Sequence, residues 1–389
     1  MHKIMQVAQD AYQAALDKHE AKIVNNILEM ESFVPVENKV PSQIQKVAIV
    51  VPTLKRYAGG HTSILRLGTC LEESGYSVSY VSFHNQDLKK MSQVAHDNLS
   101  GVRGRFVQYS AVLNVKYDVC IATSWESVYW SKQLHGYKIY FVQDFEPFFF
   151  KLNERYLLAK KTYELGFHII SLGNWNVKQI QKYCSVIGKI DSVDFPYEPS
   201  EYKNASRDFS LYRNKKEINI AVYSKEEGKR IPNLLQVILK KAYSEFEKEG
   251  IKINVKFFGF KKNHTVAIGE NCGKLSKKEL VKLYEESDFG MVASMSNISL
   301  VPYEMIAVGL PVIEFAEGSY TDFLPEDSAI LIDYNYHTLV EKISESLMYP
   351  EKLEIMTRKA SKAIESLSWE KTGKEFVGIM RGIEKEKLS

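Results

Sequence analysis

Short apolar runs that alternate with helical segments constrain the fold of this chain more than any other feature of its sequence. The run at 46–51 (KVAIVV) is followed directly by Pro52, and such a continuous apolar run is typical of a parallel strand buried on both faces. A helix is expected over 61–74, and further strands are expected at 77–83, 117–122, 138–142 and 167–171. Strands that alternate with helices predict a doubly wound α/β domain.

The same alternation restarts after a polar stretch. Residues 194–216 are rich in Pro, Ser, Asn and charged side chains, which indicates a linker. Beyond it we expect strands at 218–223, 253–258, 289–293, 311–315 and 329–332, and helices at 231–249, 277–286 and 301–308. Two such halves enclose a cleft, and doubly wound sheets bind ligands at the carboxyl ends of their strands. Helical periodicity from about Gln6 to Met30 predicts an N-terminal helical extension over 1–40.

Length and composition agree with two domains. A chain of 389 residues exceeds one ordinary core. Its net charge of +3 gives no electrostatic case for a nucleic-acid partner. The four cysteines lie in no metal-ligand spacing, and neither a signal-peptide core nor a membrane-spanning apolar run is visible. We therefore expect a cytoplasmic protein.

A pair of glycines follows the first strand. The segment Tyr57-Ala-Gly-Gly-His61 contains Gly59 and Gly60 directly before the expected helix. Paired glycines let backbone N–H groups approach a ligand, and the following helix N-terminus favours an anion. The segment is not the G-x-G-x-x-G fingerprint of dinucleotide-binding proteins. Contact with a phosphate or a sugar is therefore expected, with a tight turn as the structural alternative.

Two carboxylates follow another buried strand, in the segment 141–147 (FVQDFEP). Asp144 and Glu146 flank an aromatic residue at the rim where ligands bind, so they could hold sugar hydroxyls or accept a proton from an acceptor. The structural alternative is that Asp144 caps a turn or the next helix.

Cations and a polar loop follow strands of the second half. Lys225 and Arg230, in the run 223–230 (YSKEEGKR), could neutralise a diphosphate leaving group, although such runs are usually solvated loops. Asn297, Ile298 and Ser299 precede a helix, where loop N–H groups suit a pyrophosphate. Glu304 lies one turn inside that helix, where its carboxylate could bind ribose or sugar hydroxyls.

Residues 304–313 (EMIAVGLPVI) resemble the C-terminal half of glycosyltransferase family 4, which carries two glutamates in the pattern E-x7-E. Glu304 matches the second glutamate, whereas Ser296 stands at the position of the first. The resemblance implies the GT-B fold, in which two Rossmann-like domains face a central cleft. It also implies transfer with retention of configuration and without a divalent metal.

A narrower resemblance, from Lys46 to about Phe376, is to the WsaF-type rhamnosyltransferases, with 142–149 (VQDFEPFF) as its most specific part. These bacterial enzymes use dTDP-L-rhamnose to build surface polysaccharide. Residues 273–288 follow the family's nucleobase-side pattern, which includes Leu275 and Tyr284. We also assign Gly259 to the donor side. Ser368-Trp-Glu370 resembles the start of a helix, here 369–389, that crosses back to the first domain.

The resemblance assigns acceptor binding to 41–205 and nucleotide-sugar binding to 206–368. Asp144, Glu146 and Glu304 are the expected catalytic residues. The expected donor-binding residues are Gly59, Gly60, His61, Lys225, Arg230, Gly259, Leu275, Tyr284, Asn297, Ile298, Ser299 and Glu304. The expected reaction transfers L-rhamnose from dTDP-L-rhamnose to a growing O-antigen, capsule or cell-wall glycan.

Three alternatives stay open: a GT-B transferase using another UDP-, GDP- or dTDP-sugar, a catalytically silent carbohydrate-binding protein, and a sugar-phosphate epimerase. The histidines form no acid–base set that favours the epimerase. The aromatic run 145–150 and the pair Lys160-Lys161 could meet a membrane carrying a lipid-linked acceptor. Core packing explains the same aromatic residues equally well. The N-terminal helix could support a homo-oligomer.

Overall fold

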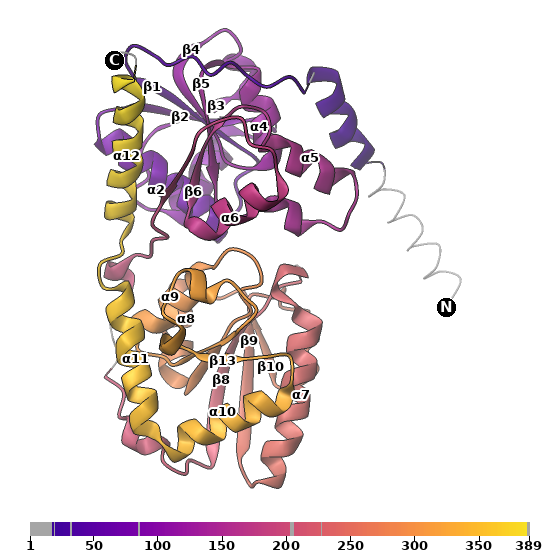
Figure 1. Cartoon of the computed structure of the whole chain (residues 1–389), viewed down its shortest axis with the longest axis vertical. Helices are drawn as coiled ribbons and strands as arrows, with labels where there is room; N and C mark the ends of the chain where they lie inside the picture. The colour runs from indigo at the N-terminus through magenta and orange to yellow at the C-terminus, as the bar shows by residue number, and fades with distance from the viewer. Residues whose placement is uncertain are drawn as a thin grey trace.

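The computed structural model describes residues 18, 20–31, 33–84, 86–202, 206–226 and 228–386. Two parallel sheets, one above the other in Figure 1, form the two halves of the molecule. The first sheet has the strand order β3-β2-β1-β4-β5-β6-β7, and the second has the order β10-β9-β8-β11-β12-β13. Both orders reverse beside the first strand of the half, which is the point where doubly wound sheets bind ligands.

The N-terminal sheet contains β1 (Lys46–Val51), β2 (Ser77–Ser82), β3 (Arg105–Gln108), β4 (Lys116–Ala122), β5 (His135–Val142), β6 (His168–Leu172) and β7 (Ile190–Val193). Its helices are α2 (Gly59–Glu73), α3 (Leu88–Asn98), α4 (Trp125–Lys132), α5 (Glu154–Thr162) and α6 (Asn174–Tyr183). The central strand β1 is buried on both faces from Val47 to Val51, because helices cover the sheet on both sides.

The C-terminal sheet contains β8 (Glu217–Tyr223), β9 (Lys252–Phe258), β10 (Glu270–Gly273), β11 (Phe289–Met291), β12 (Val312–Phe315) and β13 (Ile330–Ile332). Its helices are α7 (Pro232–Lys248), α8 (Lys277–Glu286), α9 (Leu300–Ala307), α10 (Tyr336–Met348) and α11 (Pro350–Ile364). The predicted doubly wound architecture is confirmed. The short edge strands β3, β7 and β10 were not predicted, because their sequences RFVQ, IDSV and ENCG lack a sustained apolar pattern.

Helix α12 (Trp369–Lys385) returns to the N-terminal half, where it runs alongside α2 (Figure 1). Phe376 meets Phe141 edge to face, with 5.8 Å between the ring centroids. The Glu384 carboxylate accepts the N–H of Ile44 at 2.6 Å. The first domain therefore uses residues from both ends of the described chain.

An apolar cluster also joins the two halves. Phe195, in the predicted linker, stacks on Tyr303 of α9 with 5.3 Å between the ring centroids, and it meets Phe323 edge to face. The linker is therefore packed rather than free. Of the predicted N-terminal helical extension (1–40), residues 1–17, 19 and 32 lie outside the described part, and a helix is present at 20–30. Within the described residues, no helix is both long enough and apolar enough to cross a membrane.

Candidate functional site

The Asp144 carboxylate lies at the contact between the two domains. Asp144 is the second residue after the end of β5. Its carboxylate accepts hydrogen bonds from the C-terminal domain. Its Oδ2 accepts from Ser296 Oγ at 2.9 Å and from Lys229 Nζ at 3.2 Å. Its Oδ1 accepts from the N–H of Asn297 at 3.1 Å. We call Asp144, Lys229, Ser296 and Asn297 the bridging cluster. Because Asp144, Ser296 and Asn297 are buried, these contacts are largely shielded from water.

Asn297 also connects the loop between β11 and α9 to the carboxyl ends of β5 and β6 in the N-terminal domain. Its Nδ2 donates to the carbonyl of Gln143 at 2.7 Å and to the carbonyl of Leu172 at 3.1 Å. Its Oδ1 is buried and has no hydrogen-bond partner among the described residues, and the same holds for Ser224 Oγ and Ser299 Oγ. Buried polar atoms are ordinarily hydrogen-bonded. These three atoms, at the carboxyl ends of β8 and β11, are therefore candidates to bind a polar ligand.

Lys229 is a cation at the contact between the domains that the sequence did not single out. Its Nζ lies 3.8 Å from the centroid of the Phe149 ring and pairs with Asp144. Lys229 belongs to the 3₁₀ turn Gly228–Arg230, and Ile231 after it has a φ of +38°. That conformation is unfavourable for a β-branched residue, so the surrounding structure must hold this turn in place.

The two cations named from the sequence have other surroundings. Arg230 is 4% exposed and donates to the carbonyl of Ala293 at 3.1 Å. Lys225 Nζ lies 5.8 Å from the centroid of the Tyr223 ring. Lys229 is the cation whose ammonium group pairs with the Asp144 carboxylate in the bridging cluster.

Glu314 is a second buried carboxylate that sequence reasoning missed. It accepts from the N–H of Ser294 at 3.0 Å and from Ser294 Oγ at 2.6 Å. Burial raises the pKa of Glu314 to about 7, although these hydrogen bonds and nearby Arg230 act in the opposite direction. The sequence feature that could have revealed Glu314 is its position as an acidic residue inside the apolar run 311–315 (PVIEF).

Glu146 lies within the N-terminal domain, apart from the bridging cluster. Its Oε2 accepts from the N–H of Trp125 at 3.0 Å, and its Oε1 accepts from the Tyr140 hydroxyl at 3.2 Å. Burial raises the pKa of Glu146 to about 8. The carboxyl group thereby ties the segment after β5 to the first residue of α4. Its catalytic role stays a prediction.

Glu304 and Tyr284, both predicted on the donor side, are brought together. The Tyr284 hydroxyl donates to Glu304 Oε2 at 3.2 Å, and Tyr202 also hydrogen-bonds this carboxylate. Burial raises the pKa of Glu304, and both tyrosine hydroxyls oppose that rise. Tyr202 belongs to the linker, so the linker reaches the carboxylate that we predicted to bind ribose or sugar.

The glycine segment approaches the bridging cluster from the N-terminal domain. Helix α2 begins at Gly59, and a Cβ atom at Gly60 would lie 3.4 Å from Gln143 Oε1. His61 Nδ1 accepts the N–H of Lys55 at 2.8 Å, which stabilises the loop before the helix. Burial lowers the pKa of His61. The N-terminus of α2 is therefore next to the residue that precedes Asp144.

Three further predicted donor-side residues are positioned through packing. Gly259 follows β9 with a φ of +101°, and a Cβ atom there would come within 2.6 Å of the Ser224 carbonyl. Only glycine permits this close approach at the ends of β8 and β9. Leu275 and Ile298 belong to the apolar cluster that joins the domains. Among the described residues, no group of three or more His, Cys, Asp or Glu side chains could hold a metal ion.

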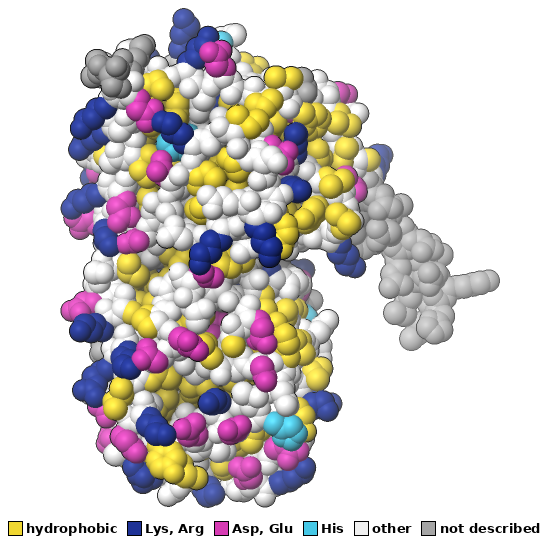
Figure 2. All heavy atoms as spheres, viewed as in Figure 1, with side chains coloured by type: hydrophobic (Ala, Val, Ile, Leu, Met, Phe, Trp, Pro, Cys, Tyr) yellow, Lys and Arg dark blue, Asp and Glu magenta, His cyan; other side chains and the backbone are white. Residues whose placement is uncertain are grey.

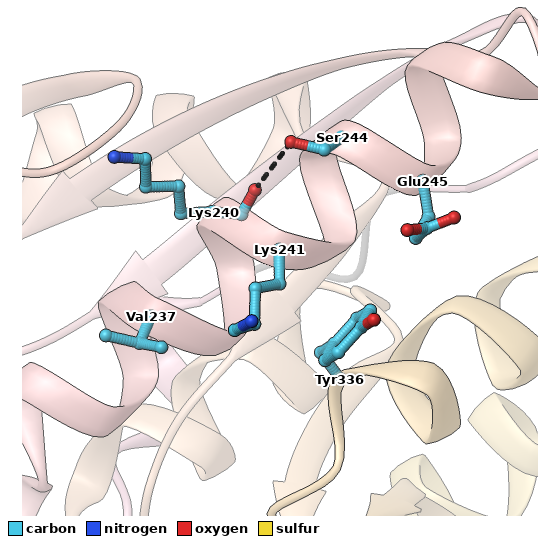
Figure 3. A pocket seen from close by; sticks show the side chains of 6 residues that line it. All are labelled: Val237, Lys240, Lys241, Ser244, Glu245 and Tyr336. Carbon is cyan, nitrogen blue, oxygen red and sulfur yellow. Dashed lines mark hydrogen bonds between the residues drawn. The ribbon is translucent and has the colours of Figure 1, made fainter.

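A surface groove lies on the C-terminal domain, away from the residues predicted to form the site. The groove in Figure 3 lies between α7 and the start of α10 and is lined by Val237, Lys240, Lys241, Ser244, Glu245 and Tyr336. Its drawn hydrogen bond joins Ser244 Oγ to the Lys240 carbonyl within one helix. On the face shown in Figure 2, basic side chains gather where the two halves meet. The bridging cluster, where three donors of one domain converge on a buried carboxylate of the other, is the candidate site that the contacts support best.

Known structures share this architecture at low sequence identity. No protein-family model and no curated protein matches the chain. Sucrose-phosphate synthase from Thermosynechococcus elongatus matches with a TM-score of 0.67 and 12% identity, and HepE from Anabaena in complex with UDP-glucose matches with 0.67 and 11%. TarM matches with 0.66 and 11%. Each match covers 87% of this chain and 99% of the other chain. The chain therefore has the GT-B fold predicted from its sequence, with two Rossmann-like domains built on parallel sheets.

Proposed function

We propose that this chain is a glycosyltransferase that moves a sugar from a nucleoside diphosphate donor to a glycan acceptor. The observation that carries the proposal is the bridging cluster, in which an ammonium group, a hydroxyl group and a backbone N–H of one domain converge on a carboxylate of the other. Converging donors of this kind bind phosphate oxygens. The shared fold supports the same reaction class.

The donor diphosphate would lie against the C-terminal domain. A departing nucleoside diphosphate needs its developing negative charge stabilised. Lys229 and the N–H of Asn297 would supply that stabilisation, and the N-terminus of α9, which follows Ser299, would add the positive end of its dipole. Ser224 Oγ offers a further hydrogen bond. Gly59 and Gly60 would close over the diphosphate and the sugar from the other domain.

The ribose or sugar would bind at Glu304. Its carboxylate already accepts hydrogen bonds from tyrosine hydroxyls, and donor hydroxyls would replace one of them. Asp144 and Glu146 are assigned to the acceptor side from their place in the sequence after a buried strand. Transfer with retention of configuration rests on the resemblance to family 4.

We propose L-rhamnose, carried on dTDP, as the donor sugar. Position 296 is a serine rather than the glutamate of family 4, so a carboxylate that would bind sugar hydroxyls is absent from this loop. Rhamnose is a 6-deoxy sugar and has one hydroxyl fewer than a hexose such as glucose. The acceptor would be a surface glycan, free or lipid-linked, bound by the N-terminal domain.

A UDP-sugar is the second candidate donor, because HepE, which shares the fold, was solved in complex with UDP-glucose. Thermal unfolding with dTDP-rhamnose, UDP-glucose, UDP-N-acetylglucosamine and GDP-mannose separates the candidates. A donor at a hundredfold excess over its Kd stabilises the folded chain by about 2.7 kcal/mol. We expect dTDP-rhamnose to give the largest rise in Tm, and Lys229→Met to reduce that rise.

Lys359→Met is the matched control, since Lys359 pairs with Asp327 on the surface. A larger rise with UDP-glucose would replace rhamnose as the donor and leave the reaction class intact. The transferase proposal would be wrong if none of the four donors raised the Tm and none were hydrolysed or transferred. Binding without turnover would instead identify a silent carbohydrate-binding protein.

A further inference from the structure

The Asp144 carboxylate accepts hydrogen bonds from three donors that belong to the other domain. Lys229 Nζ, Ser296 Oγ and the N–H of Asn297 all come from the C-terminal domain and all donate to it. Among the described residues of its own domain, the N–H of Phe145 donates to the Asp144 carboxylate at 2.9 Å, and the Tyr163 hydroxyl donates to the Asp144 carbonyl at 3.3 Å. The hydrogen-bond donors of the C-terminal domain that could bind phosphate oxygens are thus bonded to a carboxylate of the N-terminal domain.

We infer that Asp144 competes with the diphosphate of the donor for Lys229, Ser296 and Asn297, so that donor binding displaces it. The identity of the ligand rests on the proposed function. Displacement never leaves Lys229 without a counter-charge, because the diphosphate replaces the carboxylate. An unpaired ammonium group at this half-buried position would be costly.

Replacement of Asp144 by the diphosphate implies that the donor binds before Asp144 can contact an acceptor. While Asp144 is bound by Lys229, Ser296 and Asn297, its carboxylate cannot contact an acceptor. Once the diphosphate takes those three donors, the carboxylate becomes available on the N-terminal side. Donor binding therefore prepares the acceptor side.

The domains do not depend on Asp144 alone for their contact. Asn297 Nδ2 still donates to the carbonyls of Gln143 and Leu172, and Phe195 still stacks on Tyr303. Replacing Asp144 should therefore change the occupancy of the anion site without separating the two halves.

Inorganic pyrophosphate is the probe, titrated calorimetrically into the full chain. Asp144→Asn removes the competing charge while keeping an oxygen that Ser296 and Asn297 can contact. We expect its Kd for pyrophosphate to fall about tenfold, equivalent to about 1.4 kcal/mol. Asp327→Asn, which removes a carboxylate paired with a lysine on the surface, should leave the Kd unchanged. In a Lys229→Met background, Asp144→Asn should give a much smaller gain. An equal or weaker affinity for Asp144→Asn than for the wild type would overturn the inference.

Hydrogen exchange gives a second measurement that does not rely on affinity. Asp144→Ala should speed exchange in a peptide covering 294–299, because the N–H of Asn297 loses its acceptor, and pyrophosphate should slow it again. Exchange equal to that of the wild type would count against the inference. If pyrophosphate behaves as expected but no nucleotide sugar reacts, the proposed function fails and the competition stands. If transfer occurs while Asp144→Asn leaves the Kd unchanged, the competition alone fails.

Discussion

Replacing Glu146 with glutamine tests whether this buried carboxyl group is held mainly in its protonated form. Glu146 is 7% exposed, and burial raises its pKa from the ordinary 4.5 to about 8. The folded state therefore binds the proton more tightly than the unfolded state does. Below pH 4.5 both states are protonated and Glu146 costs nothing. As the pH rises from 4.5 to 8, the unfolded state ionises first, so the free energy of unfolding falls.

The size of that fall follows from the pKa difference. A rise from 4.5 to about 8 corresponds to roughly 5 kcal/mol, and relaxation around the ionised group reduces it to a few kcal/mol. Glutamine resembles the protonated acid. Its oxygen can accept the N–H of Trp125, and its amide can donate to the Tyr140 hydroxyl. We expect Glu146→Gln and the wild type to be nearly equal in stability at pH 5 and the variant to be more stable at pH 8.5.

Urea denaturation followed by tryptophan fluorescence measures the difference. Trp125, Trp130 and Trp175 account for three of the four tryptophans and lie in the N-terminal domain, so the signal reports mainly on the domain that contains Glu146. Glu354→Gln, which removes an exposed carboxyl group on α11, is the charge-matched control. A stability difference between Glu146→Gln and the wild type that is the same at pH 5 and pH 8.5 would refute the reasoning.

Three further changes have expected outcomes. Glu314→Gln should, like Glu146→Gln, raise the free energy of unfolding relative to the wild type as the pH rises. The gain should be smaller, because burial raises the pKa of Glu314 only to about 7; a stability difference in urea denaturation that does not change with pH would contradict this. Tyr202→Phe should lower the free energy of unfolding by about 1 kcal/mol, since Glu304 loses a hydrogen bond, and calorimetric unfolding measures the loss. Gly68→Ala should cost about 1–3 kcal/mol, because its Cβ would lie 2.2 Å from the Tyr80 hydroxyl; an unchanged Tm would show that Tyr80 moves freely.

The sequence predicted the fold well because the strands that determine it are buried on both faces. The run 46–51 coincides with β1, and the run 218–223 coincides with β8 within one residue. The edge strands escaped prediction for the opposite reason. β10, for example, is half-exposed and carries Glu270 and Asn271, so burial does not impose an apolar pattern on it.

The candidate site was harder to predict, because local turns decide where a side chain points. Asp144 and Glu146 are two residues apart and would share a face in a strand, but β5 ends at Val142 and a 3₁₀ turn begins at Glu146. The Asp144 carboxylate therefore reaches the C-terminal domain, and the Glu146 carboxylate reaches the start of α4. The turn at Gly228–Arg230 similarly selects Lys229 over Arg230. No periodicity in the sequence encodes these directions.

The return of α12 has a consequence for biosynthesis. Phe376, Met380 and Ile383 are each at most 1% exposed, and α12 packs on a domain that begins more than 300 residues earlier in the chain. During translation the ribosome delivers the whole C-terminal domain before it delivers α12. That domain can therefore finish folding first, while the earlier domain exposes the apolar groove that α12 later fills. The half that is made first is therefore completed last.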